Sequence, residues 1–255
     1  DYVLKILNNN GSFDESEESM LSDELEFYSK LNHPGIISLF GINFDSFRYP
    51  NKYEPSIITE YFPNGSLKEI FNKEERSIPI DYWNPTKKYI SLLGISHTMG
   101  YLHKNKVIHG DLKPENILYD GNYYPHISDC FLPTCLKNSF IEAVRLAMSG
   151  QFQTSLLYMS PEILYNDEYG PSVDVFSFAI IAYQIITGKQ PYYELDTQTT
   201  SPIHFASKIH GGYRPHFTKE VTKKMQKLLS KCWSEKIEER PSFESIIESI
   251  KNHDF

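Results

Sequence analysis

The pattern of apolar and polar residues changes once along the chain. In the first part, short apolar runs between polar loops predict strands over residues 2–7, 36–44 and 56–61, the first of them mostly buried. Between the first two strands, apolar residues recur at helical spacing from Met20 to Leu31, which predicts one helix. After the third strand, helical spacing prevails. The chain therefore opens with a small strand-rich part and continues with a larger helical part.

Helices are expected in the second part over residues 67–73, over 85–104 and from Ser172 onward. The helix over 85–104 should turn one face inward, made of Ile90, Leu93, His97 and Tyr101 or Leu102. We interpret His97 as a packed or half-buried side chain rather than a ligand.

Length and composition narrow the class of protein. The 255 residues are long for one domain and short for two, so one domain with two lobes fits. A hydrophobic content of 40% supports a large core, and a formal net charge of −8 argues against non-specific nucleic-acid binding. The longest apolar run, Val175–Ile186, is too short to span a bilayer, and there is no signal peptide. The cysteines form no metal-type pair, which favours reduced thiols in a cytoplasmic protein; they are Cys130, Cys135 and Cys232.

One polar loop carries the chemistry around which the chain is organised. It reads His109-Gly110-Asp111-Leu112-Lys113-Pro114-Glu115-Asn116-Ile117-Leu118, and short strands are expected on either side, over 107–108 and 117–118. Asp111 offers a carboxylate that can accept a proton, Lys113 a cation, and Asn116 an amide oxygen for a hard metal ion. The alternative is a plain polar loop between two apolar runs.

This stretch resembles the catalytic loop of protein kinases, in the form found in Ser/Thr kinases, and we call residues 109–118 the catalytic loop. The resemblance implies an α+β, two-lobed protein-kinase-like fold, with a small, partial antiparallel β lobe holding one helix and a large, mainly helical lobe. It implies one kinase domain over 1–255, with a partial N-terminal lobe over 1–61 and the hinge and C-terminal lobe over 62–255. The implied cofactors are ATP and Mg²⁺.

The resemblance also assigns the groups that hold the nucleotide phosphates. Lys5 resembles the strand lysine that contacts them. The segment Leu31-Asn32-His33-Pro34-Gly35-Ile36 resembles a family motif, and nine residues before its histidine stands Glu24, the expected ion-pair partner of Lys5. Asp23 and Glu26 are close enough in sequence to leave that register open. In the family a Gly-rich loop precedes the strand lysine; the chain starts too late to contain it and lacks an initiator Met, so we interpret the chain as a fragment.

A second stretch, Thr59-Glu60-Tyr61-Phe62-Pro63-Asn64-Gly65-Ser66-Leu67, resembles the hinge between kinase lobes. Thr59 would then line the back of the adenine pocket, and the carbonyl of Glu60 and the backbone groups of Phe62 would meet the adenine edge. The alternative is an ordinary strand-to-helix turn.

The segment around Asp129 aligns with the family motif whose aspartate holds Mg²⁺. Two of its positions depart from the family, because Cys130 replaces a packing Phe and Phe131 replaces a Gly. In addition, Gly110 replaces an Arg that pairs with a phosphorylated activation loop in many kinases, so we expect regulation that does not depend on such phosphorylation. The possible phosphorylation sites in the activation loop of this chain are Ser139, Ser149, Thr154 and Ser155.

Four further residues have roles by resemblance. A buried Asp174 should anchor the backbone of the catalytic loop. Arg240 should form a buried ion pair with Glu162. By alignment, Ser155 falls where Ser/Thr kinases keep a hydroxyl that bridges the catalytic Asp and Lys.

The resulting hypothesis is an ATP-dependent kinase that transfers phosphate to Ser or Thr of protein substrates, with protein regulators as further partners. Lys113 favours Ser/Thr over Tyr substrates. The alternative is a pseudokinase, a nucleotide-binding or scaffold module, suggested by Gly110, Cys130 and Phe131. Neither hypothesis involves nucleic acid or membrane contact by this chain.

Overall fold

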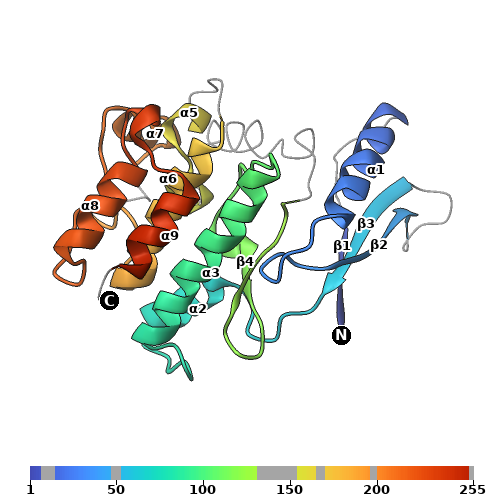
Figure 1. The fold of residues 1–255 in the computed structure, drawn as a ribbon, viewed down its shortest axis with the longest axis horizontal. Helices are drawn as coiled ribbons and strands as arrows, with labels where there is room; N and C mark the ends of the chain where they lie inside the picture. The colour runs from blue at the N-terminus through green and yellow to red at the C-terminus, as the bar shows by residue number, and fades with distance from the viewer. Residues whose placement is uncertain (7–14, 47–52, 131–153, 165–169, 196–199, 253–255) are drawn as a thin grey trace.

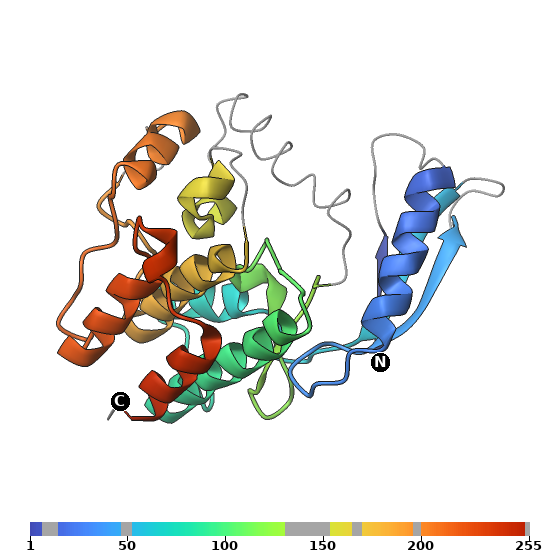
Figure 2. The ribbon, with the colours of Figure 1, turned by 45° about the horizontal axis from the view of Figure 1, so that its top comes forward.

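Two lobes make up the part of the chain that the computed structural model describes, residues 1–6, 15–46, 53–130, 154–164, 170–195 and 200–252. The small lobe is a three-stranded antiparallel sheet in the order β1-β3-β2, with one helix along it (Figures 1 and 2). Its elements are β1 (Tyr2–Ile6), α1 (Glu15–Ser29), β2 (Leu39–Asp45) and β3 (Tyr53–Glu60). The predicted α+β, two-lobed fold is confirmed.

The large lobe is mainly helical and follows β3 directly. A two-stranded ladder, β4 with β5, lies beside the catalytic loop at the boundary between the lobes. The elements in chain order are α2 (Leu67–Glu75), α3 (Pro85–Lys104), η1 (Pro114–Asn116), β4 (Ile117–Tyr119), β5 (Pro125–Ile127), η2 (Thr154–Tyr158), α5 (Pro161–Leu164), α6 (Ser172–Thr187), α7 (Pro202–His210), α8 (Lys223–Cys232), η3 (Ile237–Glu239) and α9 (Phe243–Lys251).

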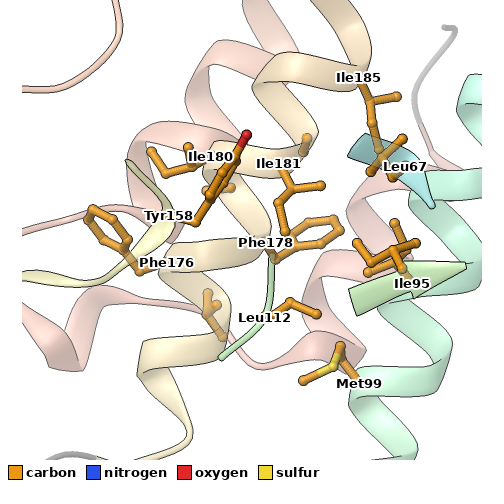
Figure 3. Packing of buried hydrophobic residues seen from close by; sticks show 14 of the residues in the cluster. Leu67, Ile95, Met99, Leu112, Tyr158, Phe176, Phe178, Ile180, Ile181 and Ile185 are labelled. Carbon is orange, nitrogen blue, oxygen red and sulfur yellow. The ribbon is translucent and has the colours of Figure 1, made fainter. Parts of the chain in front are cut away.

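Helix α6 is the centre of the large lobe, because every residue from Val173 to Ile185 is buried. Figure 3 shows its side chains facing those of α3, α2 and the catalytic loop, with Phe178 pointing toward Ile95 of α3. Full burial of one such side chain contributes about 1.5–3 kcal/mol. The catalytic loop is therefore mounted on the most deeply buried helix of the described structure.

The first strand is more exposed than the sequence predicted. Tyr2, Val3 and Leu4 are 69%, 41% and 44% exposed. The reason is that β1 is an edge strand of the described sheet, paired with β3 on one side, and the Tyr2 ring lies on the surface against the Phe40 ring, at 4.9 Å between centroids. The predicted mostly buried strand was therefore wrong about burial, although right about its position.

Two predictions around α3 were also wrong. Its buried face includes Leu92, Ile95, Met99 and Leu102, whereas His97 is exposed. No strand forms over 107–108, because the Val107 N–H donates to the Leu102 carbonyl at 2.9 Å and so closes the end of α3.

Each helix within the described ranges is too short or too polar to traverse a bilayer.

Candidate active site

The catalytic loop brings three of the predicted site residues together. Lys113 Nζ lies 2.7 Å from Asp111 Oδ2. Asn116 Nδ2 donates to the Asp111 carbonyl at 2.8 Å and to Asp111 Oδ2 at 3.2 Å. Leu112 is 2% exposed and packs in the core (Figure 3), which anchors the loop between the two charged residues. The Asp111 carboxylate is thus held in one orientation, and about a fifth of its side chain (19%) remains exposed.

Asp174 fastens the start of this loop to α6. Its two carboxylate oxygens accept the backbone N–H groups of His109 and Gly110, both at 2.8 Å, and His103 Nε2 lies 2.8 Å from Oδ2. Burial by itself would raise the pKa of Asp174, but the hydrogen bond and charge of His103 and the Gly110 N–H oppose it, and the pKa is lowered. The predicted anchoring role of Asp174 is confirmed.

Gly110 sits in the left-handed region, with φ of 70°, where glycine has no steric penalty. The glycine at this position therefore suits the turn that lets its N–H reach Asp174. The family's Arg at the same place would have to adopt a conformation that is rare for a residue with a side chain.

His109 connects the catalytic loop to the segment that carries Asp129. The Asp111 N–H donates to His109 Nδ1 at 3.2 Å, so Nδ1 is the unprotonated nitrogen and Nε2 donates to the Ser128 carbonyl at 2.8 Å. The imidazole is fully buried. One neutral histidine therefore fixes the backbone of both Asp111 and the residue before Asp129.

Lys5 and Asp129, which come from different lobes, form an ion pair. Lys5 Nζ lies 2.6 Å from Asp129 Oδ2, with the side chains 40% and 16% exposed. The backbone of Asp129 has φ of 61°, a left-handed conformation that Asp tolerates better than most residues. Glu24 belongs to α1, but its side chain lies outside the described residues, so its pairing with Lys5 stays a prediction.

The predicted hinge residues follow the end of β3. Thr59 and Phe62 are each 6% exposed, and the Phe62 ring lies 4.7 Å from the His126 ring. The Glu60 carboxylate accepts the Ser38 N–H at 2.6 Å, which points this side chain back along the sheet. The Phe62 carbonyl accepts the Gly65 N–H at 3.1 Å in a tight turn. The turn is as expected, and the contacts with adenine stay predictions.

Asn116 and Asp129 fit a Mg²⁺ site in chemical type and in position. Both supply hard oxygen donors, and the Ser128 N–H donates to the Asn116 carbonyl at 2.9 Å, which keeps the two segments adjacent. Among the residues placed in the structure, no three His, Cys, Asp or Glu side chains gather to hold a metal by themselves. Mg²⁺ commonly takes only one or two protein ligands and completes its shell with water and substrate phosphates.

Comparison with known proteins decides the family. A family model described as protein tyrosine and serine/threonine kinase matches residues 1–250. The chain belongs to the protein kinase family. It is 34% identical over 252 residues to the probable serine/threonine-protein kinase drkC of Dictyostelium discoideum, which covers 97% of the chain and 30% of that protein.

Two further relatives are also named as kinases. Serine/threonine-protein kinase 12 of Arabidopsis thaliana is 30% identical over 261 residues, covering 98% of the chain and 52% of that protein. Mitogen-activated protein kinase kinase kinase 7 of Bos taurus is 29% identical over 241 residues, covering 91% and 37%. The kinase chain thus spans about half or less of the length of these relatives.

At Cys130 the kinase chain departs from its family, and the structure has a cavity there. Cys130 is fully buried and lines a space of about 180 Å³ between the end of α1 and the strand that follows it. Apolar side chains of the same cavity are Tyr28, Leu31, Ile36 and Leu39. The Cys130 thiol, smaller than the phenyl ring that the family resemblance places at this position, borders this space. Phe131 and the segment 133–153, with Ser139 and Ser149, lie outside the described residues.

The ion pair predicted between Arg240 and Glu162 is confirmed. The guanidinium meets both carboxylate oxygens, at 2.5 and 3.1 Å, with the two side chains 1% and 5% exposed. The hydroxyl bridge expected from Ser155 stays a prediction.

The sequence pattern did not reveal the two histidines that hold the catalytic loop in place. His103 ends the inward face of α3 and His109 opens the catalytic loop, and both contact Asp174. A polar residue one turn before the loop, on the same helix face as Met99 and Leu102, was the available signal for His103.

Proposed function

We propose that the chain is the catalytic domain of an ATP-dependent protein kinase that transfers the γ-phosphate to Ser or Thr of protein substrates. The observation that carries the proposal is the convergence of Asp111, Lys113 and Asn116 in one loop. The Lys5–Asp129 pair beside it adds the cation and the carboxylate expected near the phosphates.

In this proposal each side chain has one role. Asp111 accepts the proton of the attacking hydroxyl, and Lys113, at 2.7 Å, supplies positive charge beside the moving phosphoryl group. Asn116 and Asp129 would hold Mg²⁺, which neutralises phosphate charge when bound. Lys5 would turn from Asp129 to the phosphates, and Glu24 would then be available to orient it.

Ser/Thr specificity is supported by Lys113 and by the relatives, which are named as serine/threonine-protein kinases. Thr59, Glu60 and Phe62 would form the hinge side of the adenine site. Burial raises the pKa of the Cys232 thiol to about 12, consistent with an inert, reduced side chain in the cytoplasmic address that we propose.

The pseudokinase alternative rests on Gly110, Cys130 and Phe131. The first two do not disturb a charged group of the site: the Gly110 N–H supports Asp174, and Cys130 faces a cavity behind Asp129. Every group needed to handle charge is retained, which favours catalysis.

The test follows transfer of labelled γ-phosphate from Mg·ATP to Ser, Thr and Tyr peptides, using this chain and a form extended upstream of Asp1. We expect labelled phosphoserine or phosphothreonine, lost in Asp111→Asn. Absence of transfer in both folded forms, together with a Mg²⁺-dependent thermal shift by ATP that disappears in Asp129→Asn, would replace the proposal with the pseudokinase.

A further inference from the structure

Two helices of the chain carry charges of opposite sign, and the charged residues within each helix are all of one sign. Helix α8 has four lysines and no acidic residue, and it reads KKMQKLLSKC. Helix α1 has six carboxylates and no lysine or arginine, and it reads ESEESMLSDELEFYS. The whole chain has a formal net charge of −8, so the lysine row of α8 stands out from its surroundings.

The lysines of α8 share its outer face. Lys223, Lys224, Lys227 and Lys231 are all exposed, and the last three follow one another at spacings of three and four residues, while the apolar side chains of the helix are buried in the core. Like charges at these spacings repel one another and weaken a helix. In the described parts of the chain, Lys224, Lys227 and Lys231 have no ion-pair partner of their own. The row is therefore a cationic surface with no apolar side chain to insert into a membrane.

The outer face of α1 offers complementary chemistry. Asp23 and Glu26 are exposed on the same helix as Phe27, whose side chain is 46% exposed. Glu26 has only Lys30 at 2.8 Å, in a pair whose side chains are 68% and 70% exposed. Lysine amines can pair with such carboxylates while their aliphatic stems cover an aromatic ring, and an ammonium group is itself attracted to the ring face.

These two surfaces lie at opposite ends of the molecule (Figures 1 and 2), α1 on the small lobe and α8 at the far side of the large lobe. They cannot meet within one copy. We propose that α8 of one copy binds α1 of a second copy, head to tail. Such a contact is heterologous. In a dimer one copy therefore keeps its α1 surface free and the other its α8 surface, so the assembly can extend beyond a dimer.

Sedimentation velocity of the chain at low and at high ionic strength tests the proposal. Because exposed charges are screened beyond about 10 Å at 0.1 M salt and about 3 Å at 1 M, association should be seen at low salt and lost at high salt. Two charge-neutralising variants, Lys224→Gln/Lys227→Gln/Lys231→Gln and Asp23→Asn/Glu26→Gln, should each sediment as monomers at low salt. Their melting temperatures should match that of the unaltered chain, since all five side chains are exposed.

Mixing the two variants separates a head-to-tail contact from any other. The mixture retains one intact α8 and one intact α1 on different copies, so it should form dimers and nothing larger. A control, Phe40→Ser, removes an exposed apolar side chain of β2 and should leave association unchanged.

Three results would overturn the proposal. They are a chain that stays monomeric at low salt, association that is unaffected by either charge variant, and variants that fail to recombine when mixed. Binding of the monomeric chain to phosphatidylserine vesicles, lost in the lysine variant, would assign the α8 face to a lipid surface instead.

Discussion

The stability of the large lobe should depend strongly on the buried ion pair between Arg240 and Glu162. Besides the two bonds to Glu162, the guanidinium donates to the Ser172 carbonyl at 3.1 Å and to the Ser234 carbonyl at 3.0 Å. It also lies 5.2 Å from the centroid of the Phe176 ring. One side chain thus ties α5, the start of α6 and the segment before α9 together.

In Arg240→Ala the Glu162 carboxylate stays buried without its counter-charge, and two carbonyls lose a donor. Breaking a buried pair in this way costs about 3–5 kcal/mol. At about 2–4 °C per kcal/mol for a domain near this size, the melting temperature should fall by about 6–20 °C. Calorimetry or urea unfolding measures the change.

Two matched variants separate the pairing from general damage. Lys30→Ala removes an exposed pair and should leave the melting temperature unchanged. Replacing both partners, Arg240→Met with Glu162→Leu, should recover much of the loss, because no lone charge remains buried. If Arg240→Ala instead melted at the same temperature as Lys30→Ala and the unaltered chain, the Arg240–Glu162 pair would contribute no stability to the large lobe.

Three further changes have definite expected results. Cys130→Phe should fill part of the cavity beside α1 and raise the unfolding free energy by about 1–2 kcal/mol in urea titrations; a loss of stability would mean that the space cannot take a ring. Ser160→Ala removes a buried hydroxyl without a hydrogen-bond partner in the described structure and should stabilise by about 1 kcal/mol, so a lower melting temperature would reveal a hidden partner. The pKa of Asp174 in the folded chain lies below its unfolded value of about 4, so its contribution to stability is present above pH 4 and is lost as pH falls through the folded-state pKa. Asp174→Asn should therefore weaken the dependence of the unfolding free energy on pH in acid, and it should also lower kcat. An unchanged pH dependence would contradict the lowered pKa.

The catalytic loop could be predicted from sequence because its chemistry is local. Asp111, Lys113 and Asn116 stand within six residues, so one loop conformation is enough to bring them together. The long-range partners of Arg240 and Asp174 came from the family resemblance rather than from periodicity. Lys5 shows the limit, since its described partner is Asp129, which comes from the other lobe.

The errors have physical causes too. Helix α3 is covered on more than one side, by α6, α9 and β5, so its apolar residues do not mark a single face and His97 was placed wrongly. An apolar strand such as β1 looks buried in sequence, although burial depends on layers that the pattern does not reveal. The sequence did not show that His109 connects two segments, because its imidazole ring bonds to backbone groups, the N–H of Asp111 and the carbonyl of Ser128.

We propose that Asp111 is the general base of an active protein kinase. The most direct measurement is the rate of γ-phosphate transfer from Mg·ATP for the unaltered chain, Asp111→Asn and a surface control, Asp81→Asn, each in the form extended upstream of Asp1. We expect Asp111→Asn to lower the rate by about 10²–10⁴-fold with little change in the KM for ATP, while Asp81→Asn transfers at the unaltered rate. Equal rates for Asp111→Asn and the control would contradict this proposal.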